Sequence, residues 1–251
     1  MAARWSTAWV TGASTGIGRA LAIALARSGT TVAVSARSAD TLAELARLQP
    51  GIVPVVLDVT EPDAVAAAHA HILNTIGPIN LAVLNAGVWD PMRAAEFDAA
   101  RAVRSMQVNF GGVANALQPL IPAMIARGRG HIALVASVAG YRGLPKAAAY
   151  APSKAAVISL AEVLRLELVS RGITVSLVNP GFVETPMTAV NEFPMPYMIK
   201  AEDAAARIIR GLERGQFEIA FPWPLVAQLK LLRILPYSLY FRLVGRLVGR
   251  D

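Results

Sequence analysis

The stretch that decides the fold is Thr11-Gly12-Ala13-Ser14-Thr15-Gly16-Ile17-Gly18, which lies between an apolar run at residues 5–10 and a helical pattern at residues 18–28. Glycines between a strand and a helix let the backbone approach a pyrophosphate, whose charge is favoured at the helix N-terminus. A glycine loop alone is weak evidence, because many tight turns contain glycine. The flanking strand and helix make a dinucleotide site the better interpretation. The predicted contacts are Gly12, Ser14, Thr15, Gly16, Ile17 and Gly18.

Strands and helices alternate along the rest of the chain. Short, almost continuously hydrophobic runs predict further strands at residues 31–35, 53–57, 79–84, 131–135 and 174–178. Such runs are typical of strands buried on both faces of a parallel sheet. Helical periodicity covers residues 62–76, 94–127 (expected as two pieces), 148–170 and 202–214. This order predicts an α/β fold, a doubly wound Rossmann-type parallel sheet with helices on both faces.

The composition excludes several classes of protein and of functional site. With 55% hydrophobic and 16% charged residues, the 251-residue chain is not intrinsically disordered. It has no cysteine, which excludes a disulfide framework, a thiol nucleophile and a thiolate zinc site. The three histidines are not spaced as a metal cluster, so no metal is expected. No signal peptide precedes the glycine motif and no apolar run suits a membrane span, so we expect a cytoplasmic protein.

The positive charge is concentrated at the end of the chain. The formal net charge is +7, and residues 223–251 supply +4 of it through five basic residues and one acid. The rest of the chain is therefore close to charge balance. A nucleic-acid-binding protein needs a basic stripe with base-reading or stacking groups, so no nucleic-acid partner is expected.

The end of the second predicted strand indicates which dinucleotide is bound. An acidic side chain there would accept hydrogen bonds from the ribose 2′-hydroxyl and repel a 2′-phosphate. Here the strand ends in Ser35-Ala36-Arg37-Ser38, and the first acid is Asp40. Arg37 can donate two charge-assisted hydrogen bonds to a phosphate, although a solvated arginine at a strand end is the simpler alternative. The missing acid and the present base together predict NADP(H) in preference to NAD(H).

Four polar residues form a candidate catalytic set. Tyr150 and Lys154 are four residues apart at the start of a predicted helix and so share a face. An ammonium beside the phenol, joined by the positive charge of oxidised nicotinamide, is expected to lower the tyrosine pKa from its usual value near 10. Ser137 follows a strand, and Asn109 lies in a helical stretch. Singly, each has a structural explanation, as a helix pair, a loop serine or a satisfied core amide.

Together with the glycine loop, these residues resemble the short-chain dehydrogenase/reductase family in its compact single-domain branch. The resemblance covers residues 7–188 in at least five ordered motifs. It implies reversible hydride transfer between the nicotinamide and a carbonyl or secondary alcohol. Ser137 would hold the substrate carbonyl, Tyr150 would be the general acid/base, Lys154 would hold the nicotinamide ribose and lower the Tyr150 pKa, and Asn109 would anchor a proton-relaying water.

The same resemblance extends the cofactor site. Asp58 and Val59 match the family's adenine-contacting pair, and Asn85-Ala86-Gly87 matches its segment beside the cofactor. The segment from Pro180 through Thr185 matches the part where the threonine commonly contacts the nicotinamide carboxamide. Leu84 stands where the family often has a second asparagine, and this difference leaves the implied reaction unchanged. The implied further cofactor contacts are Asp58, Val59, Asn85, Ala86, Gly87, Tyr150, Lys154, Pro180, Gly181, Val183 and Thr185.

The segment after the sixth strand, residues 182–199, is expected to cover the substrate. Its apolar side chains suit a lipophilic carbonyl compound, although they could equally close over the body of the protein. Besides Ser137 and Tyr150, the expected substrate contacts are Phe182, Met187 and Phe193.

The resemblance ends near residue 221, which divides the chain into a catalytic domain, residues 1–221, and an extension, residues 222–251. Two helices are predicted, at residues 225–235 and 237–250. In the second, Leu239, Leu243 and Leu247 recur every four residues, and Arg242, Arg246 and Arg250 recur about a right angle away. Such a basic amphipathic helix suits an anionic membrane or a neighbouring subunit. Subunit packing is slightly favoured, and a homo-oligomer, dimer or tetramer, is expected.

Two other functions fit the same motifs. One is a 3-oxoacyl-thioester reductase, which would favour a basic entrance for an acidic carrier. The other is a catalytically silent NADP-binding regulator or scaffold, because a fold alone does not prove activity. The complete set Asn109, Ser137, Tyr150 and Lys154 favours an enzyme.

Overall fold

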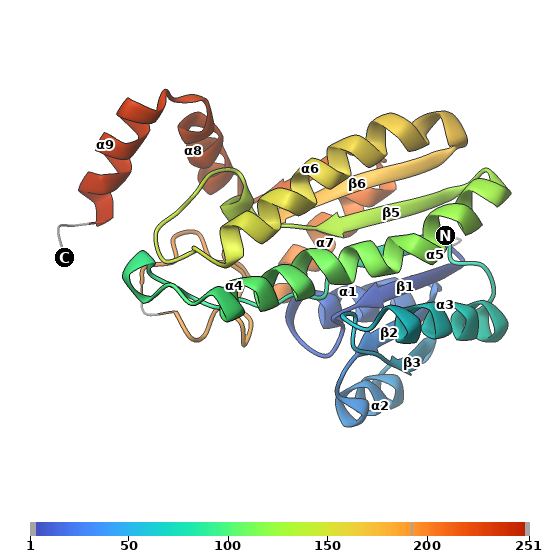
Figure 1. Ribbon diagram of the computed structural model, residues 1–251. Helices are drawn as coiled ribbons and strands as arrows, with labels where there is room; N and C mark the ends of the chain where they lie inside the picture. Colours follow the sequence, from blue (N-terminus) through green and yellow to red (C-terminus); the bar gives the residue numbers. More distant parts are fainter. Residues whose placement is uncertain (1–3, 192, 249–251) are drawn as a thin grey trace.

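The computed structural model describes residues 4–191 and 193–248. Its centre is a seven-stranded sheet in the order β3-β2-β1-β4-β5-β6-β7, in which every neighbouring pair is parallel (Figure 1). The chain winds outward in opposite directions from β1 and β4, so their carboxyl ends open the crevice in which doubly wound folds bind ligands. The predicted fold class is confirmed. The strands are β1 (Thr7–Thr11), β2 (Thr31–Ala36), β3 (Ile52–Val56), β4 (Leu81–Leu84), β5 (Gly130–Val135), β6 (Ile173–Pro180) and β7 (Glu218–Phe221).

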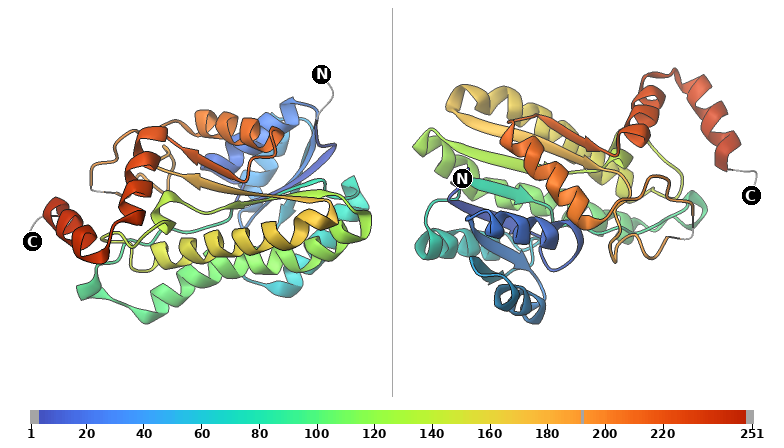
Figure 2. Two further views of the ribbon diagram at one scale, coloured as in Figure 1. Left: turned by 90° about the horizontal axis from the view of Figure 1, so that it is seen from above. Right: turned by 180° about the vertical axis from the view of Figure 1, so that it is seen from behind.

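Helices cover both faces of the sheet (Figure 2). One face packs against α3 (Pro62–Ile76), α5 (Gly112–Arg127) and α6 (Tyr150–Leu168). The other packs against α1 (Gly16–Arg27), α2 (Ala39–Leu48) and α7 (Ala201–Glu213). Because both faces are covered, the strands bury side chains in both directions, which explains their nearly unbroken hydrophobic sequences.

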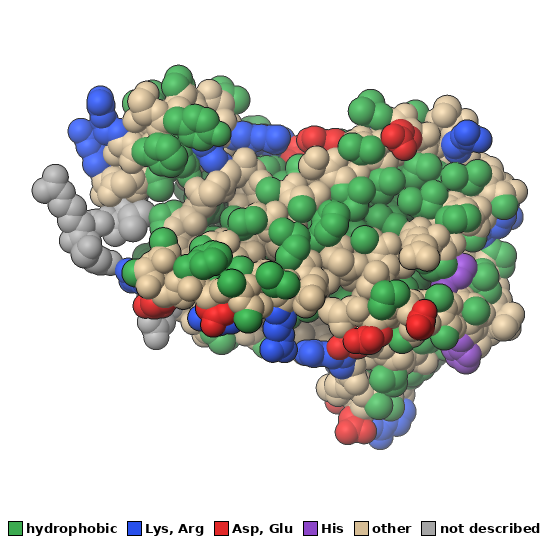
Figure 3. Space-filling model, viewed as in Figure 1, with side chains coloured by type: hydrophobic (Ala, Val, Ile, Leu, Met, Phe, Trp, Pro, Cys, Tyr) green, Lys and Arg blue, Asp and Glu red, His purple; other side chains and the backbone are tan. Residues whose placement is uncertain are grey.

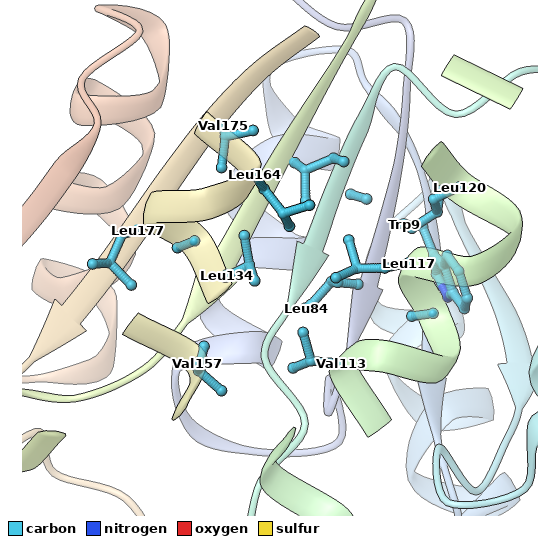
Figure 4. Packing of buried hydrophobic residues seen from close by; sticks show 14 of the residues in the cluster. Trp9, Leu84, Val113, Leu117, Leu120, Leu134, Val157, Leu164, Val175 and Leu177 are labelled. Carbon is cyan, nitrogen blue, oxygen red and sulfur yellow. The ribbon is translucent and has the colours of Figure 1, made fainter. Parts of the chain in front are cut away.

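The strand β1 shows how the two halves of the core are divided. Trp9 points toward the α3–α5–α6 side, whereas Ala8 and Val10 point toward the α1–α2–α7 side, as the period of two in a strand requires. Trp9 is fully buried and its indole Nε1 donates to Ser35 Oγ at 2.9 Å, so its one polar group is satisfied. Figure 4 shows the core on this side, with side chains from the strands and from α5 and α6 in one cluster.

Two elements, α2 and β7, were not predicted from the sequence. The helix α2 buries only Leu42 and Leu45, so its apolar stripe is narrow, and it begins at a capping serine, Ser38. The strand β7 has four residues and starts with a glutamate. The strand β7 is too short to show a clear period. The helix α2 does carry helical signals that the prediction overlooked, the cap at Ser38 and the two buried leucines three residues apart.

The stretch at residues 94–127 is divided more finely than predicted. It contains the 3₁₀ turn η1 (Ala94–Glu96), the helix α4 (Ala99–Met106), the π turn η2 (Gln107–Gly111) and then α5. Single π turns inside helices occur often at functional sites. This one contains Asn109, whose side chain is completely buried.

The C-terminal extension forms two helices, α8 (Trp223–Ile234) and α9 (Tyr237–Val248). Elsewhere in the chain, the 3₁₀ turns η3 (Val138–Gly140) and η4 (Val169–Arg171) follow β5 and α6. The two helices project from one end of the body, near the loop that precedes α6 (Figure 1). Arg250 of the predicted basic helix lies outside the described residues. Within residues 4–191 and 193–248, no helix has the length and apolarity needed to cross a membrane.

Candidate active site

The glycine loop is shaped by close contacts that only glycine permits. Gly12 has a φ of +67°, and a Cβ there would lie 2.7 Å from the Cα of Ala86. A Cβ on Gly18 would lie 2.3 Å from the carbonyl oxygen of Gly12. The helix α1 begins at Gly16, and Thr15 gives it no side-chain cap, so the N–H groups of its first turn face the loop without a side-chain partner. Such a cradle fits a pyrophosphate.

The strand β4 is tied to the glycine loop by Thr11 and Asn85. The Thr11 hydroxyl oxygen accepts from the backbone N–H groups of Asn85 at 3.0 Å and Ala86 at 3.1 Å. The Asn85 amide donates to the carbonyls of Thr11 and Gly12, both at 3.1 Å. Asn85 therefore holds the loop in place, and Ala86 and Gly87 follow it at the carboxyl edge of the sheet.

The residues expected at the adenosine end lie beside the edges of β2 and β3. Arg37 is exposed directly after β2. The Asp58 carboxylate accepts from Thr60 N–H at 3.0 Å and from its hydroxyl at 2.8 Å, and these bonds, with the charge of Arg37, lower the Asp58 pKa. Val59 is buried, and its carbonyl accepts from Asn115 at 2.9 Å. The structure thus places Arg37 within electrostatic reach of Asp58.

Ser137, from the loop after β5, lies near Tyr150 and Lys154 of the helix α6. Ser137 caps the turn η3 after β5, accepting from Ala139 N–H at 3.1 Å. Tyr150 is the first residue of α6, and one turn later the Lys154 ammonium lies 5.6 Å from the centre of the Tyr150 ring. That ammonium is buried and donates to the carbonyl of Val135 at 3.0 Å.

The expected lowering of the tyrosine pKa is not seen in the protein alone. Burial raises the pKa of Tyr150 to about 12, and the Ser137 hydroxyl, which stabilises the phenolate, opposes this only in part. Burial also lowers the pKa of Lys154 to about 8. The reason is that the crevice removes both groups from water, and desolvation disfavours the charged form of each.

The Asn109 side chain is held by three hydrogen bonds to two other segments. Its Oδ1 accepts from Val88 N–H at 2.7 Å, and its Nδ2 donates to the Val88 carbonyl at 3.0 Å and to Ser153 Oγ at 2.9 Å. Both amide N–H groups are used, so the side chain retains only acceptor capacity. A Cβ on Gly87 would lie 3.0 Å from Asn109 Oδ1 and 3.4 Å from Lys154 Nζ, which brings these two residues to the same point.

The segment after β6 closes over the glycine loop. A Cβ on Gly16 would lie 2.8 Å from Thr185 Cγ2, so Thr185 rests directly on the loop. Pro180, whose carbonyl accepts from Ser137 Oγ at 3.4 Å, ends β6, and Gly181 N–H donates to Phe221 at 2.7 Å. Val183 is buried and pairs with Ile199 in an isolated bridge.

Two of the three predicted substrate residues contact each other. Phe182 and Phe193 meet at 6.1 Å between ring centroids, and Lys146 Nζ lies 5.9 Å from the Phe193 ring. Met187 is exposed. The two phenylalanines therefore join the start of the segment at residues 182–199 to a point eleven residues further along it.

The sequence interpretation missed Trp89, Asn191 and Ser153. The Trp89 ring lies edge-on to Tyr150, and its Nε1 donates to Asn191 Oδ1 at 2.8 Å, which ties the segment after β6 to the candidate catalytic residue. The available signal was a tryptophan two residues beyond Asn85-Ala86-Gly87, a position close to the expected cofactor. Ser153 gave no signal, because only the fold brings it to Asn109. Among the described residues, no group of three acidic or histidine side chains could hold a metal ion.

Comparison with known proteins agrees with this geometry. A family model described as short chain dehydrogenase matches residues 6–193. An uncharacterized oxidoreductase of Myxococcus xanthus is 37% identical over 247 residues, 97% of this chain and 98% of that protein. A 3-oxoacyl-(acyl-carrier-protein) reductase of Thermotoga maritima is 35% identical, covering 80% of this chain and 87% of its own.

A solved structure gives the same result. The short chain dehydrogenase/reductase of Burkholderia phymatum in complex with NAD has a TM-score of 0.84 and 26% identity, covering 92% of this chain and 94% of its own. The chain belongs to the short-chain dehydrogenase/reductase family. It is an oxidoreductase of that family, as its resemblance implied.

Proposed function

We propose that the protein is an NADP(H)-dependent oxidoreductase that transfers hydride between the nicotinamide and a carbonyl or secondary alcohol of an apolar substrate. The observation that carries the proposal is the convergence of Asn109, Ser137, Tyr150 and Lys154 around one point beside Gly87 and the carboxyl end of β5. They come from a π turn, a loop and a helix start, and a purely structural role would not require all four together.

Each residue has a defined task. Ser137 donates a hydrogen bond to the substrate oxygen, and Tyr150 gives its phenolic proton to that oxygen as negative charge develops on it. Lys154 supplies a buried positive charge one helical turn away, while Asn109 fixes the chain at Val88 and Ser153. When bound, the nicotinamide supplies or accepts the hydride, and its oxidised form adds a positive charge that favours the phenolate.

Two features support a nicotinamide dinucleotide, and a third favours NADP(H). The glycine loop provides a cradle that fits a pyrophosphate, and a structural neighbour was solved with NAD. At the adenosine end, Arg37 is exposed after β2 with no acidic residue in its place. A guanidinium can hold a 2′-phosphate by two hydrogen bonds, which favours NADP(H).

A direct assay tests this function. Purified protein is mixed with NADPH or NADH and a panel of lipophilic ketones and aldehydes, and loss of the reduced-nicotinamide absorbance is followed. We expect turnover with NADPH and a fall of about 100-fold or more in Tyr150→Phe, with NADPH binding retained. The matched variant Tyr237→Phe, at an exposed tyrosine of α9, should keep full activity. Full turnover by Tyr150→Phe would contradict the assignment of Tyr150, and absence of any turnover would favour a silent regulator.

A second candidate is a 3-oxoacyl-thioester reductase. It is favoured by the 35% identity to the Thermotoga maritima enzyme of that name. Including a 3-oxoacyl thioester in the panel separates the two, because a preference for the thioester over simple ketones would select this candidate.

The homo-oligomer remains a proposal. It is supported by three exposed apolar side chains on and just after α6, those of Val163, Leu166 and Val169. A helix that packs on the sheet would be expected to expose polar side chains on its outer side. Exposed apolar side chains on one helix can meet their copies across a two-fold axis. Light scattering of the purified protein measures the state directly.

A further inference from the structure

The outer side of α8 carries a continuous apolar stripe. Trp223, Ala227, Leu231 and Ile234 follow one another at intervals of four and three residues, so they project from one side of the helix. Trp223 is 72% exposed, Leu231 60% and Ile234 77%. Large apolar side chains gathered on one exposed side mark contact with a partner.

The next helix extends this surface. Tyr237 is 72% and Phe241 64% exposed, and their rings stack with centroids 5.8 Å apart. In Figure 3, hydrophobic side chains gather over this projecting part, with lysine and arginine at its outer edge. We call Trp223, Leu231, Ile234, Tyr237 and Phe241 the outer face.

The outer face stands on a fixed support. On its inner side α8 buries Leu225 and Val226 in the core. Arg142 donates to the carbonyls of Leu235 at 2.8 Å and Arg233 at 3.1 Å, and its guanidinium lies 3.9 Å from the centre of the Tyr240 ring. The buried Tyr240 hydroxyl in turn donates to the Gly143 carbonyl. The extension is thus held against the loop between Ser137 and Tyr150.

The charge around the outer face is mainly positive, because the acid beside it, Glu218, is already paired with Lys230. From residue 219 to residue 248 the sequence contains Lys230, Arg233, Arg242 and Arg246 and no acidic residue. Arg242 and Arg246 are exposed on α9. A second copy packed on the same face would bring arginines together without an acid from that face to pair with them, which is unfavourable. An anionic lipid surface offers both an apolar layer and negative charge.

We propose that α8 and α9 dock the protein on the surface of an anionic lipid bilayer. The outer face enters the boundary between headgroups and acyl chains, and the positive charges of Arg242 and Arg246 add electrostatic attraction to the lipid phosphates. Each helix has 12 residues and so spans about 18 Å, well short of the hydrocarbon core of about 30 Å. The helices therefore lie in the interface and do not cross it.

Flotation of the full chain with vesicles tests this docking. The probes are phosphatidylcholine vesicles with and without phosphatidylglycerol, at low and physiological salt. We expect the protein to float with the anionic vesicles, and more weakly as salt rises. The double variant Leu231→Glu with Ile234→Glu should lower the partition coefficient at least about tenfold, because two apolar anchors become anions. Arg242→Gln with Arg246→Gln should lower it about tenfold or more on anionic vesicles.

The matched control is Leu48→Glu, at the exposed last residue of α2, which lies in the body of the protein. It should float like the unchanged protein, and circular dichroism should show every variant folded. Absence of flotation with anionic vesicles, or an equal loss in Leu48→Glu, overturns the proposal. So does a result in which Leu231→Glu with Ile234→Glu changes only the oligomeric state, since a second copy would then cover the outer face.

Tryptophan fluorescence gives an independent readout that needs no destabilising variant. Trp5 and Trp9 are buried, whereas Trp223 is exposed. Anionic vesicles should shift the emission to shorter wavelength, and Trp223→Phe should remove that shift while flotation persists. An unchanged shift in Trp223→Phe contradicts insertion of α8.

Discussion

The indole ring of Trp89 lies edge-on against the phenol ring of Tyr150, with ring centroids 4.9 Å apart and planes at 89°. The same indole donates from Nε1 to Asn191 Oδ1 at 2.8 Å. One side chain therefore contacts both the proposed acid and the segment that we expect to cover the substrate. Edge-to-face pairs of this kind contribute about 0.5–1.5 kcal/mol beyond the area they bury.

Replacement of Trp89 should impair catalysis without preventing folding. In Trp89→Ala the ring contact and the hydrogen bond to Asn191 are both lost, so we expect kcat/KM to fall about tenfold, through a higher KM and a lower kcat. Trp89→Phe keeps the ring contact and should lose less. Steady-state kinetics measures both, with Trp223→Ala as the control for removal of an indole. Equal kinetics in Trp89→Ala and the unchanged protein would contradict the role.

Arg37 should select between the two dinucleotides. Removal of its guanidinium in Arg37→Ala deletes a two-bond contact with a 2′-phosphate, so we expect the Kd for NADPH to rise about tenfold or more and the Kd for NADH to change little. Titration of each cofactor measures this. Arg47→Ala, at an exposed arginine of α2, is the matched control. Equal losses for both cofactors would contradict 2′-phosphate binding.

The buried Lys154 should make stability rise at alkaline pH. Burial lowers its pKa in the folded protein to about 8, below the usual 10.5, so between these values the unfolded chain binds a proton that the folded protein has lost. The free energy of unfolding therefore rises with pH through this window, by about 2–3 kcal/mol between pH 8 and pH 10.

Above pH 10 the opposite effect begins, because burial raises the Tyr150 pKa to about 12 and its contribution is lost as pH increases. Urea unfolding at several pH values measures both slopes. In Lys154→Met the rise from pH 8 should disappear, whereas Lys200→Met, at the surface, should keep it. An unchanged pH profile in Lys154→Met would contradict the buried ammonium.

Arg142 should hold the C-terminal helices in place. Its Nη1 donates to carbonyls at the end of α8, and its guanidinium lies over Tyr240 and, at 4.8 Å, over Tyr237. In Arg142→Ala we expect local opening of α9 to become easier by about 2 kcal/mol, which is about thirtyfold faster amide exchange. Hydrogen exchange of α9 measures it, with the exposed Arg129→Ala as control. The same protection in both variants would show that Arg142 does not hold α9.

The elements that could be predicted were those with a strong local signal. The glycine loop, the buried strands and the helix at Pro62–Ile76 are marked by glycine spacing, by unbroken hydrophobic runs and by a proline at the helix start. The four-residue strand β7 lacks such a signal, because its place is set by pairing with β6 rather than by a pattern in its own residues.

Within the candidate site, the sequence indicated which residues take part, but not their burial, their pKa values or their hydrogen-bond partners. Tyr150 and Lys154 would share one face of any helix. Only the folded crevice removes both side chains from water, which raises the pKa of Tyr150 and lowers the pKa of Lys154. Likewise, the amide of Asn109 is committed to Val88 and Ser153, which are distant in the chain.

By itself, the sequence determined the doubly wound sheet, the dinucleotide loop and the family, because these depend on local spacing that survives in any context. Tertiary structure alone decided that Trp89 joins Tyr150 to Asn191 and that Arg142 fixes an outward apolar face. These contacts link residues up to 102 positions apart, and no period in the chain encodes such a distance. Burial and long-range hydrogen bonds depend on which surfaces meet when the layers pack.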